Sequence, residues 1–513
     1  MRPSLQHGSS GRAQDRRLST DEYAGRCALQ AGWCKDGRLI QGEGGRAVAE
    51  AGRDDEVDVL ILGAGSGGYA CALRAAQLGL SVALVEQGKL GGTCLHVGCI
   101  PTKALLHAAE VADSAREAET FGVLAKYDGI DAVAVRNYAD GVVSRLFKGL
   151  TGLIKSRGIR VVEGRGQVTG PRQVTVDTAE GPVVLTGRNL VLATGSEPRA
   201  LPGIEIDGDK VLTSDDALRL ERVPQTAIVL GGGVIGCEFA SVWRSFGADV
   251  TIVEALPRLL PPEDAASSTA LERAFRRRGI TAKTGTSVTA VATTDEGVVV
   301  TLSDESELRA DVLLVAVGRV PRTAGLGYEE QGIPLDRGYV TADERCRTGV
   351  EGVYAVGDIV PGLQLAHRGF QQGIFVAEEI AGLAPQAIDE RGIPRVTYSR
   401  PEVASVGLTE EQAKAEYGDT VTSLTYDLAG NGKSQILRTQ GFVKLVRQAD
   451  GPVVGVHLVG ERVGELIGEA QLVYGWEAFP DDVAPLVHAH PTQNEALGEA
   501  FLALAGKPLH AHS

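Results

Sequence analysis

Residues 57–68 read Val57-Asp-Val-Leu-Ile-Leu-Gly63-Ala-Gly65-Ser-Gly-Gly68, and this stretch decides the fold. The unbroken apolar run at 57–62 is typical of a strand buried in a parallel sheet. The glycines predict a tight turn, and residues 69–78 predict the helix that follows it. A second predicted strand, 81–85, ends at Glu86. Strand, glycine turn, helix, strand and acid in this order form the dinucleotide-binding fingerprint.

Each part of the fingerprint has a physical role. Gly63 is expected to make the turn, Gly65 to let the backbone approach a pyrophosphate, and Gly68 to let the helix pack on the sheet. The helix N-terminus is expected to face the phosphates, and Glu86 to bind ribose hydroxyls. The first module therefore predicts one dinucleotide site.

The same module returns later in the chain. Residues 227–230 predict a strand, and Gly231-Gly-Gly233-Val234-Ile235-Gly236 predict the turn. Glu254 lies 23 positions after Gly231, the same spacing that separates Glu86 from Gly63. This internal repeat predicts that one chain binds two dinucleotides.

The residues after the second acid indicate which nicotinamide cofactor fits. Glu254 would repel a ribose 2′-phosphate, and Ala255 and Leu256 supply no adjacent cation, so the site favours NAD over NADP. Arg258 is close enough in sequence to leave NADP open.

Two cysteines follow the first module, in the stretch Gly91-Gly92-Thr93-Cys94-Leu-His96-Val-Gly98-Cys99-Ile-Pro101-Thr102-Lys103. A disulfide needs Cα atoms roughly 4.4–6.8 Å apart, which this spacing allows only in a bent or one-turn segment. Pro101 suits the first position of a helix, so Cys99 is expected at a helix N-terminus, where the dipole favours a thiolate. The pair is predicted to be a redox-active disulfide.

A base for this thiol chemistry is available near the C-terminus, in the stretch His488-Ala-His490-Pro-Thr-Gln-Asn-Glu495. Histidine transfers protons near neutral pH. Glu495 could orient the ring of His490, completing a set of nucleophile, base and orienting group.

Composition excludes several classes of protein. The 513 residues allow two to four domains, and a hydrophobic content of 43% supports sizeable cores. A net charge of −15 argues against a nucleic-acid partner and is ordinary for a cytoplasmic enzyme. No apolar run approaches the ~18–20 residues of a membrane span. Seven cysteines do not form a disulfide framework, and only His96 and His107 lie near the pair, so no metal site is predicted.

The remaining segments differ in character. Residues 1–55 lack sustained periodicity and are interpreted as a disordered extension or a start assigned too early. Residues 104–156 predict a helical hairpin, and 160–194 predict short strands. Strands near 397, 421, 441–446 and 453–459, with helices at 464–476 and 493–504, predict a C-terminal α+β region.

The region from 56 to 508 resembles the dihydrolipoamide dehydrogenases, class I members of the pyridine nucleotide–disulfide oxidoreductase family. The matching segments are GAGSGGYACALRAAQLG, VEQGKLGGTCLHVGCIPTKALLH, ATGSEPR, GGGVIGCEFASVW, AVGRVPRT, YAVGDI, YSRPEVASVGLTE and HAHPTQNE. The resemblance implies an α/β fold with two Rossmann-like domains, for FAD and NAD, and a C-terminal α+β dimerisation domain. It places the FAD domain at 56–200 and 330–394, the NAD domain at 201–329 and the interface domain at 395–513.

The resemblance also implies an activity and partners. The protein would oxidise protein-bound dihydrolipoyl groups with NAD, through a redox-active disulfide and FAD. It would act as a cytoplasmic homodimer and meet lipoyl-bearing acyltransferase subunits of 2-oxo acid dehydrogenase complexes or a glycine cleavage lipoyl protein, with the base donated by the partner subunit.

Site residues carry over position by position. Cys94 resembles the thiol that exchanges with lipoamide, Cys99 the thiol touching the flavin, and Lys103 a lysine beside the flavin that pairs with Glu238. His490 resembles the base and Glu495 its orienting partner. The implied FAD contacts are Gly63, Gly65, Gly68, Glu86, Gly92, Thr93, Lys103, Gly166, Thr194, Gly195, Ser196, Asp358 and Ala366. The implied NAD contacts are Gly231, Gly233, Val234, Ile235, Gly236, Glu254, Val288, Gly318 and Arg319.

Competing classes are each tested by one feature. Mercuric reductase needs a second cysteine pair near the C-terminus, but the last cysteine is Cys346. Glutathione reductase places arginines after its second module, and a soluble transhydrogenase lacks the cysteine pair. A non-catalytic flavoprotein would show damage at the cysteines or at His490, and none is present.

Two residues of the cysteine loop depart from the usual family pattern. His96 stands where Asn is usual, and is expected either to face solvent or to adjust thiolate stability. Thr102 replaces a common Ser.

Overall fold

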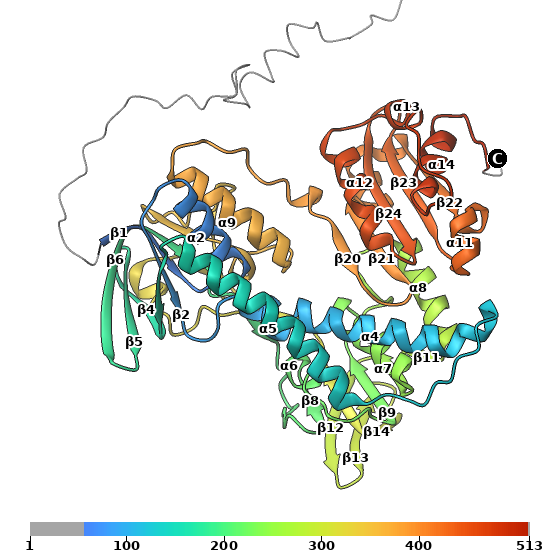
Figure 1. Cartoon of the computed structure of the whole chain (residues 1–513), viewed down its shortest axis with the longest axis horizontal. Coiled ribbons are helices and arrows are strands. Elements are labelled where there is room, and N and C mark those ends of the chain that lie inside the picture. Colours follow the sequence, from blue (N-terminus) through green and yellow to red (C-terminus); the bar gives the residue numbers. More distant parts are fainter. Residues whose placement is uncertain (1–55, 511–513) are drawn as a thin grey trace, which may run out of the picture. The chain divides into compact units, whose positions relative to one another are not determined.

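The computed structural model describes residues 56–510, so the interpretation of residues 1–55 lies outside the described residues. Within this part of the chain three sheets account for most of the strands, and each has its own helical cover (Figure 1). No helix among residues 56–510 is long and apolar enough to cross a membrane.

The first sheet carries the first glycine module. Its strand order is β3 (Arg160–Glu163), β2 (Val82–Glu86), β1 (Glu56–Leu62), β6 (Gly181–Leu192), β5 (Gln173–Thr178), β4 (Arg165–Gly170), and β19 (Val353–Ala355) also pairs with β6. Strands β1, β2, β3, β6 and β19 run parallel, as the apolar run at 57–62 predicts. The return of β19 to this sheet confirms that the chain comes back to the first module after leaving it.

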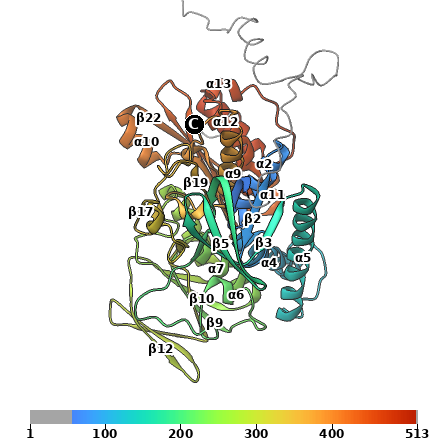
Figure 2. The same cartoon turned by 90° about the vertical axis from the view of Figure 1, so that its left-hand side faces the viewer.

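Helices α2 (Ser66–Gln77) and α9 (Ala366–Ile380) pack on this sheet at close range. A Cβ on Gly373 of α9 would strike the carbonyl of Gly67 in α2, so only glycine permits the two helices to approach each other this closely. Helices α4 (Cys99–Glu117) and α5 (Ala132–Ser156) pack against each other and form the predicted hairpin (Figure 2). The side chain of Ile154 in α5 joins the core of this sheet.

The second sheet repeats the arrangement. Its order is β11 (Ile280–Lys283), β10 (Asp249–Val253), β9 (Thr226–Leu230), β15 (Val312–Val315) and β8 (Val211–Leu212), all parallel. Helices α6 (Ser214–Ala217), α7 (Val234–Phe246) and α8 (Ala265–Arg278) accompany it. A separate antiparallel sheet follows, made of β12 (Val288–Thr294), β13 (Gly297–Leu302) and β14 (Glu307–Ala310).

Two short antiparallel ladders accompany the two modules. Strand β7 (Ser196–Pro198) pairs with β16 (Arg319–Pro321), so the connections out of the first module and back into it run side by side. Strands β17 (Leu335–Asp336) and β18 (Tyr339–Val340) form the other ladder.

The third sheet is antiparallel and lies in the C-terminal region. Its order is β20 (Arg395–Thr397), β21 (Glu402–Gly407), β24 (Val453–Gly460), β23 (Phe442–Gln448) and β22 (Val421–Asp427). Helices α12 (Val463–Gly475) and α14 (Glu495–Leu504) share one core with it, and α10 (Glu410–Tyr417) packs in another. The short helices α11 (Gly432–Leu437) and α13 (Pro480–Val483) complete the region. This confirms the predicted α+β character, whereas the domain boundaries stay predictions.

Candidate active site

The two cysteines lie on consecutive helices. Cys94 is in the short helix α3 (Gly92–Val97), and Cys99 is the first residue of α4. Gly98 joins the helices, and a Cβ there would come within 2.9 Å of the Thr93 carbonyl oxygen. The predicted one-turn segment and the position of Cys99 at a helix N-terminus are confirmed. The expectation that Pro101 opens the helix is wrong, because α4 begins two residues earlier, at Cys99.

Both cysteines are free thiols in this structure, so it shows the dithiol form, and the disulfide form stays a prediction. The two thiols hydrogen bond to each other. That bond lowers the pKa of Cys99, and the positive charge of Lys103 lowers it further. The same bond, together with burial, raises the pKa of Cys94. The pair therefore favours a Cys99 thiolate beside a Cys94 thiol.

The positive charge near the pair is fixed by a buried carboxylate. Lys103 Nζ lies 2.9 Å from both carboxylate oxygens of Glu238, whose side chain is only 2% exposed. The backbone N–H of Tyr398 donates to the same carboxylate at 3.0 Å, and the Tyr398 ring lies 4.9 Å from Lys103 Nζ. Burial opposes the charge on Lys103, but Glu238 outweighs it, so the pKa of Lys103 is raised. Analysis of the sequence missed Tyr398, because a backbone donor leaves no signal in residue type.

His96 is held inside the cysteine loop. Its Nε2 lies 2.9 Å from the Leu90 carbonyl oxygen, and its ring meets the edge of Phe147 on α5 at 5.3 Å. The expectation that His96 simply faces solvent is therefore wrong. The imidazole instead ties α3 to the preceding loop and to α5.

The first glycine loop has the shape of a phosphate cradle. A Cβ on Gly63 would strike the Ala193 carbonyl, and one on Gly68 would strike Gly63, whereas Gly65 faces open space. Gly65 caps α2 without any side-chain hydrogen bond, so the N–H groups of that helix end stay available. Helix α2 begins at Ser66, three residues before the predicted start, because the helix grows directly out of the glycine turn. This loop fits a pyrophosphate.

The second glycine loop repeats the first at atomic level. Glu86 accepts hydrogen bonds from the N–H groups of Ala64 and Gly88, both at 2.7 Å. Glu254 accepts from Gly232 at 2.6 Å and from Leu256 at 2.7 Å. Each acid thus binds the residue after the first glycine and the residue two positions after itself. The predicted duplication is therefore visible in side-chain geometry as well as in spacing.

Steric demands at the second loop match those at the first. A Cβ on Gly231 would strike Ala316, and one on Gly236 would strike Gly231, whereas Gly233 faces open space and caps α7 without a side-chain bond. Arg258 donates to the carbonyl oxygens of Pro261 and Glu263, at 3.1 and 3.4 Å. Its guanidinium is therefore engaged with backbone and not with Glu254.

Other predicted cofactor contacts gather around the β7–β16 ladder. Ser196 Oγ donates to Asp358 at 2.5 Å, and Arg319 Nε donates to Ser196 Oγ at 2.7 Å. Arg319, predicted as an NAD contact, thus binds the hydroxyl and the carbonyl oxygen of Ser196, a residue predicted as an FAD contact. Thr194 Oγ1 donates to the Arg322 carbonyl at 2.6 Å.

The remaining predicted residues are placed by their elements. Gly92 approaches Gly65, since a Cβ on it would meet the Gly65 Cα at 2.7 Å, and Gly166 packs on Leu62. Ala366 begins α9, and Val288 begins β12 and packs on the core of the second sheet. Positive φ angles at Gly195 and Gly318 favour glycine at both positions. Thr93, Val234 and Ile235 lie in the first turns of α3 and α7.

The candidate base lies at the start of α14. His490 Nδ1 lies 2.8 Å from Glu495 Oε1, and Glu495 Oε2 accepts the Thr492 N–H at 2.7 Å. Burial opposes ionisation of Glu495, but these partners together lower its pKa. The His490 side chain is 79% exposed, and within residues 56–510 no hydrogen bond connects it to either cysteine. The predicted pairing of His490 with Glu495 is present.

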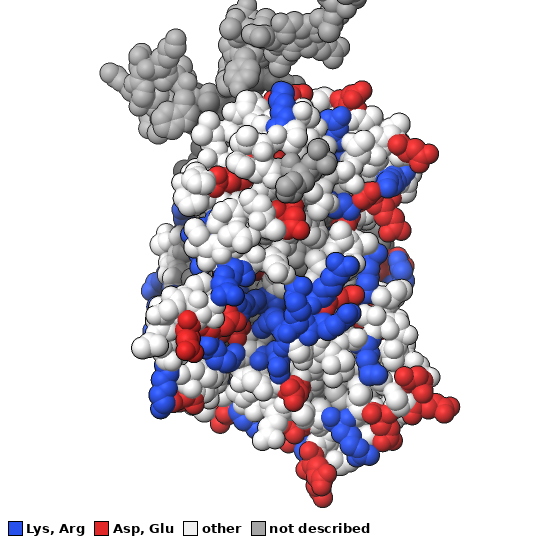
Figure 3. Space-filling view, turned by 90° about the vertical axis from the view of Figure 1, so that its right-hand side faces the viewer, with Lys and Arg blue, Asp and Glu red and all other residues white. Residues whose placement is uncertain are grey.

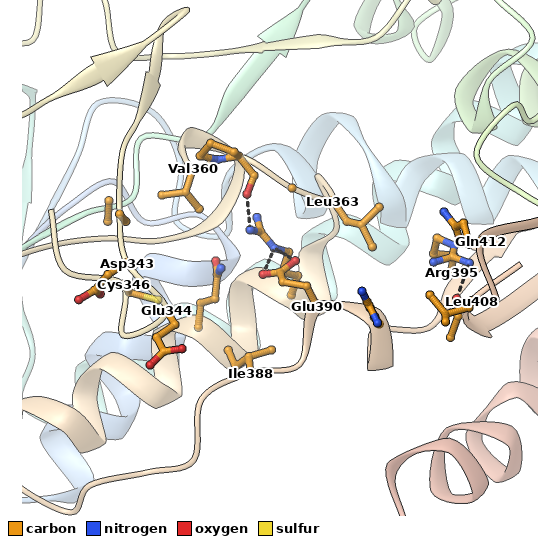
Figure 4. Close-up of a pocket in the computed structure, with 18 of the residues that line it drawn as sticks. Asp343, Glu344, Cys346, Val360, Leu363, Ile388, Glu390, Arg395, Leu408 and Gln412 are labelled. Atoms are coloured by element: carbon orange, nitrogen blue, oxygen red, sulfur yellow. Dashed lines mark hydrogen bonds and ion pairs between the residues drawn. The ribbon is translucent and has the colours of Figure 1, made fainter. Parts of the chain in front are cut away.

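A cavity of about 870 Å³ lies elsewhere, where residues 342–346 and α9 face the start of the C-terminal region (Figure 4). Buried Arg368 lies inside it and binds both carboxylate oxygens of Glu390 at 2.8 Å. No predicted site residue lines this cavity. It is therefore separate from the thiol chemistry.

The chain is similar to known proteins over most of its length. The family model "Pyridine nucleotide-disulphide oxidoreductase" matches residues 57–373, and the dimerisation domain of the same family matches residues 393–501. The dihydrolipoyl dehydrogenase of Bacillus subtilis is 42% identical over 89% of this chain and 99% of its own length. A mitochondrial dihydrolipoyl dehydrogenase of Pisum sativum is 39% identical over 91% of this chain and 95% of its own. The crystal structure of LpdA from Mycobacterium tuberculosis matches with a TM-score of 0.82, 28% identity, and coverage of 88% of this chain and 99% of that one.

Proposed function

The chain belongs to the pyridine nucleotide-disulphide oxidoreductases, and from this membership we propose that it oxidises protein-bound dihydrolipoyl groups with NAD. FAD and NAD are the cofactors of this family, and the C-terminal dimerisation domain makes the protein a homodimer. The observation that carries the proposal is the thiol pair, in which Cys99 lies at the N-terminus of α4 near the Lys103–Glu238 ion pair.

The exchange begins at the substrate dithiol. The partner subunit's His490, oriented by its glutamate, would remove a proton from one substrate thiol. The resulting thiolate attacks Cys94 Sγ in the oxidised pair, and the Cys94–Cys99 bond breaks with Cys99 leaving as a thiolate. The second substrate thiol then attacks the mixed disulfide, and its proton passes to the departing sulfur, so that Cys94 is released as a thiol. The lipoyl group leaves as a disulfide, and the cysteine pair has gained two electrons.

The pKa shifts of the two cysteines support this order of events. The product of the exchange is a Cys94 thiol beside a Cys99 thiolate, which is the state that their shifted pKa values favour. Lys103 stabilises the negative charge on Cys99. When bound, FAD accepts the two electrons from the cysteine pair and passes them to NAD.

The cofactor assignments are part of the same proposal. The Gly63–Gly68 loop and Glu86 would hold the adenosine diphosphate part of FAD, with Asp358 and Ser196 on its sugar or ribityl hydroxyls. The Gly231–Gly236 loop and Glu254 would hold NAD. A 2′-phosphate is disfavoured because Glu254 is anionic and Arg258 is engaged with backbone carbonyls.

The partners and location also belong to the proposal. Lipoyl-bearing acyltransferase subunits or a glycine cleavage lipoyl protein would supply the substrate. A cytoplasmic location agrees with the free thiols of Cys71, Cys237 and Cys346.

The test is a direct assay. The purified protein, with bound FAD confirmed by its absorbance, is mixed with dihydrolipoamide and NAD. We expect NADH to form, and no NADH from FAD-loaded protein would refute the proposal. Faster oxidation of NADPH with oxidised glutathione would reassign the activity to a neighbouring branch of the family.

A further inference from the structure

One face of the molecule carries a dense band of basic side chains. Lys and Arg gather across the middle of this face in Figure 3, on the side where Figure 1 places α8 and the end of α4. The chain as a whole has a net charge of −15, so such a concentration of positive charge runs against its composition. The band calls for a specific explanation.

The core of the band is the end of α8. Arg276, Arg277 and Arg278 form its last turn, with Arg273 one turn earlier. The side chains of Arg273, Arg276 and Arg277 are exposed, and within residues 56–510 none of the three has an ion pair or hydrogen-bond partner. One cation at a helix C-terminus is stabilised by the helix dipole. Four cations within six residues repel one another, so a stabilising effect on the helix does not explain why they are clustered.

Three further arginines extend the cluster. Arg244 donates to the Arg278 carbonyl at 2.6 Å, and Arg278 donates to the Arg400 carbonyl at 3.0 Å. Buried Asp113 then lies 2.7 Å from Arg116, 2.9 Å from Arg400 and 3.5 Å from Arg278. Asp113 therefore holds three guanidinium groups together, and with Glu117 on Arg400 two carboxylates face these three cations, which leaves one positive charge.

These seven arginines, which we name the α8 basic patch, are crowded enough to affect one another. Burial, together with the charges of Arg400 and Arg244, lowers the pKa of Arg278 to about 10 against the opposing charges of Asp113 and Glu117. The members of the patch are Arg116, Arg244, Arg273, Arg276, Arg277, Arg278 and Arg400.

The patch does not belong to the NAD site. In the second sheet Ile280 pairs with Val250 at one end of β10, and Lys283 meets Glu254 at the other. The glycine loop and Glu254 follow the carboxyl ends of the strands. The end of α8 precedes β11 and so lies at the opposite edge, about 13 Å away along a four-residue strand.

We propose that the α8 basic patch is a docking surface for an acidic, carboxylate-rich segment of a partner protein. Arginine suits this role because its planar guanidinium pairs with a carboxylate through two parallel hydrogen bonds. Exposed charges also steer association and set partner choice. The patch begins where α4 ends, 17 residues after Cys99, so about 25 Å of helix separates Arg116 from the thiol pair.

A protein partner fits this surface better than a nucleic acid. Exposed carboxylates of Glu117 and Asp249 pair with patch arginines and would repel a continuous phosphate backbone. The Tyr127 ring lies 4.6 Å from the Arg116 guanidinium and so is not free to stack on bases. Interspersed charges of both signs are what a complementary protein surface requires.

The test uses the FAD-loaded full chain and fluorescently labelled poly-L-glutamate, with binding followed by anisotropy at several salt concentrations. We expect wild type to bind at low salt and to weaken steeply as salt rises. The triple variant Arg273→Glu, Arg276→Glu, Arg277→Glu should bind on the order of tenfold more weakly or worse. Its turnover with free dihydrolipoamide should equal that of wild type, because the patch lies away from the cysteines.

A matched control separates the patch from net charge. Arg157, Arg219 and Arg222 are also exposed, and within residues 56–510 their side chains have no hydrogen-bond or ion-pair partner. The variant with Glu at all three positions should bind poly-L-glutamate as wild type does. Equal losses in both triple variants would overturn the proposal. So would tighter binding of wild type to double-stranded DNA or phosphatidylserine vesicles. Loss of the dimer in the first variant, measured by light scattering, would overturn it by assigning the patch to the subunit interface.

Discussion

Glu238 on α7 holds Lys103 on α4 with both carboxylate oxygens, each 2.9 Å from Nζ. The helix that carries Cys99 is therefore joined by an ion pair to the helix that follows the second glycine loop. The carboxylate is buried, so its charge depends on this partner and on the Tyr398 N–H.

Removing the lysine should destabilise the fold strongly. Lys103→Met leaves the Glu238 charge buried and unpaired, which costs about 3–5 kcal/mol of unfolding free energy. Glu238→Gln should cost less, because the amide can still meet its neighbours. Urea unfolding of both variants measures the difference. Lys126 provides the control, since its pair with Asp128 is exposed and Lys126→Met should change stability by less than about 1 kcal/mol.

The hydrogen bond between the two thiols predicts how the pKa of Cys99 changes when Cys94 is substituted. Cys94→Ala removes the donor that stabilises the Cys99 thiolate, so the pKa of Cys99 should rise. Cys94→Ser keeps a donor of similar size and should raise it less. The pH dependence of Cys99 alkylation, located by mass spectrometry in each variant, measures both values. Identical profiles in the two variants would show that the bond does not set the Cys99 pKa.

The proposed base can be tested against a second histidine–glutamate pair, whose glutamate also lies on α14. His490→Ala should lower kcat by about 10²–10⁴-fold while FAD stays bound, since general base catalysis contributes that much. His510 pairs with Glu499 of α14 through its Nδ1 at 2.8 Å, the same distance as the His490–Glu495 pair. His510→Ala should leave kcat within about twofold of wild type. A loss of equal size in both variants would assign the effect to α14 and not to proton transfer.

A buried charge cluster joins the second and third sheets and should govern acid stability. Lys444 Nζ lies 2.8 and 3.0 Å from the two oxygens of Asp264 and 2.7 Å from Glu410. Hydrogen bonds from Lys414 and then Lys444 lower the pKa of Glu410 from 4.5 to about 2. A carboxyl with a lowered folded pKa stabilises the fold above its unfolded pKa and loses that contribution as pH falls through the folded value.

Glu410→Gln should therefore lower Tm near neutral pH, and the difference from wild type should shrink as pH falls from about 4.5 towards 2. Calorimetry across this window measures it. Glu411 is the neighbouring exposed carboxylate, and Glu411→Gln should show no such trend. A constant difference at every pH would mean that the effect is one of packing and not of charge.

The local signals in this chain were strong enough to predict most of the elements. Apolar runs before Gly63 and Gly231 predicted buried parallel strands, and both are present. Helix starts were the recurring error, because a glycine turn and a helix overlap: α2 begins three residues before its predicted start. The same error placed the start of α4 at Pro101 instead of Cys99.

The site residues also differ in whether they could be predicted from the sequence. The spacing of Cys94 and Cys99, the glycine sets and the pair His490 and Glu495 can be recognised from neighbouring residues alone. The Tyr398 N–H on Glu238 could not be found in this way, because 160 positions separate the two residues and a backbone donor is the same in every residue type. The position of the His96 ring could not be predicted either, because it depends on the contact with Phe147 of α5.

By itself, the sequence determined the two dinucleotide modules and the thiol pair, because turn geometry and strand burial depend on residues that are close along the chain. Only the tertiary structure decided which backbone N–H supports the carboxylate that holds Lys103 and which arginines share Asp113. Electrostatic interactions act through space between side chains that are distant in sequence, so their balance exists only once the chain has folded.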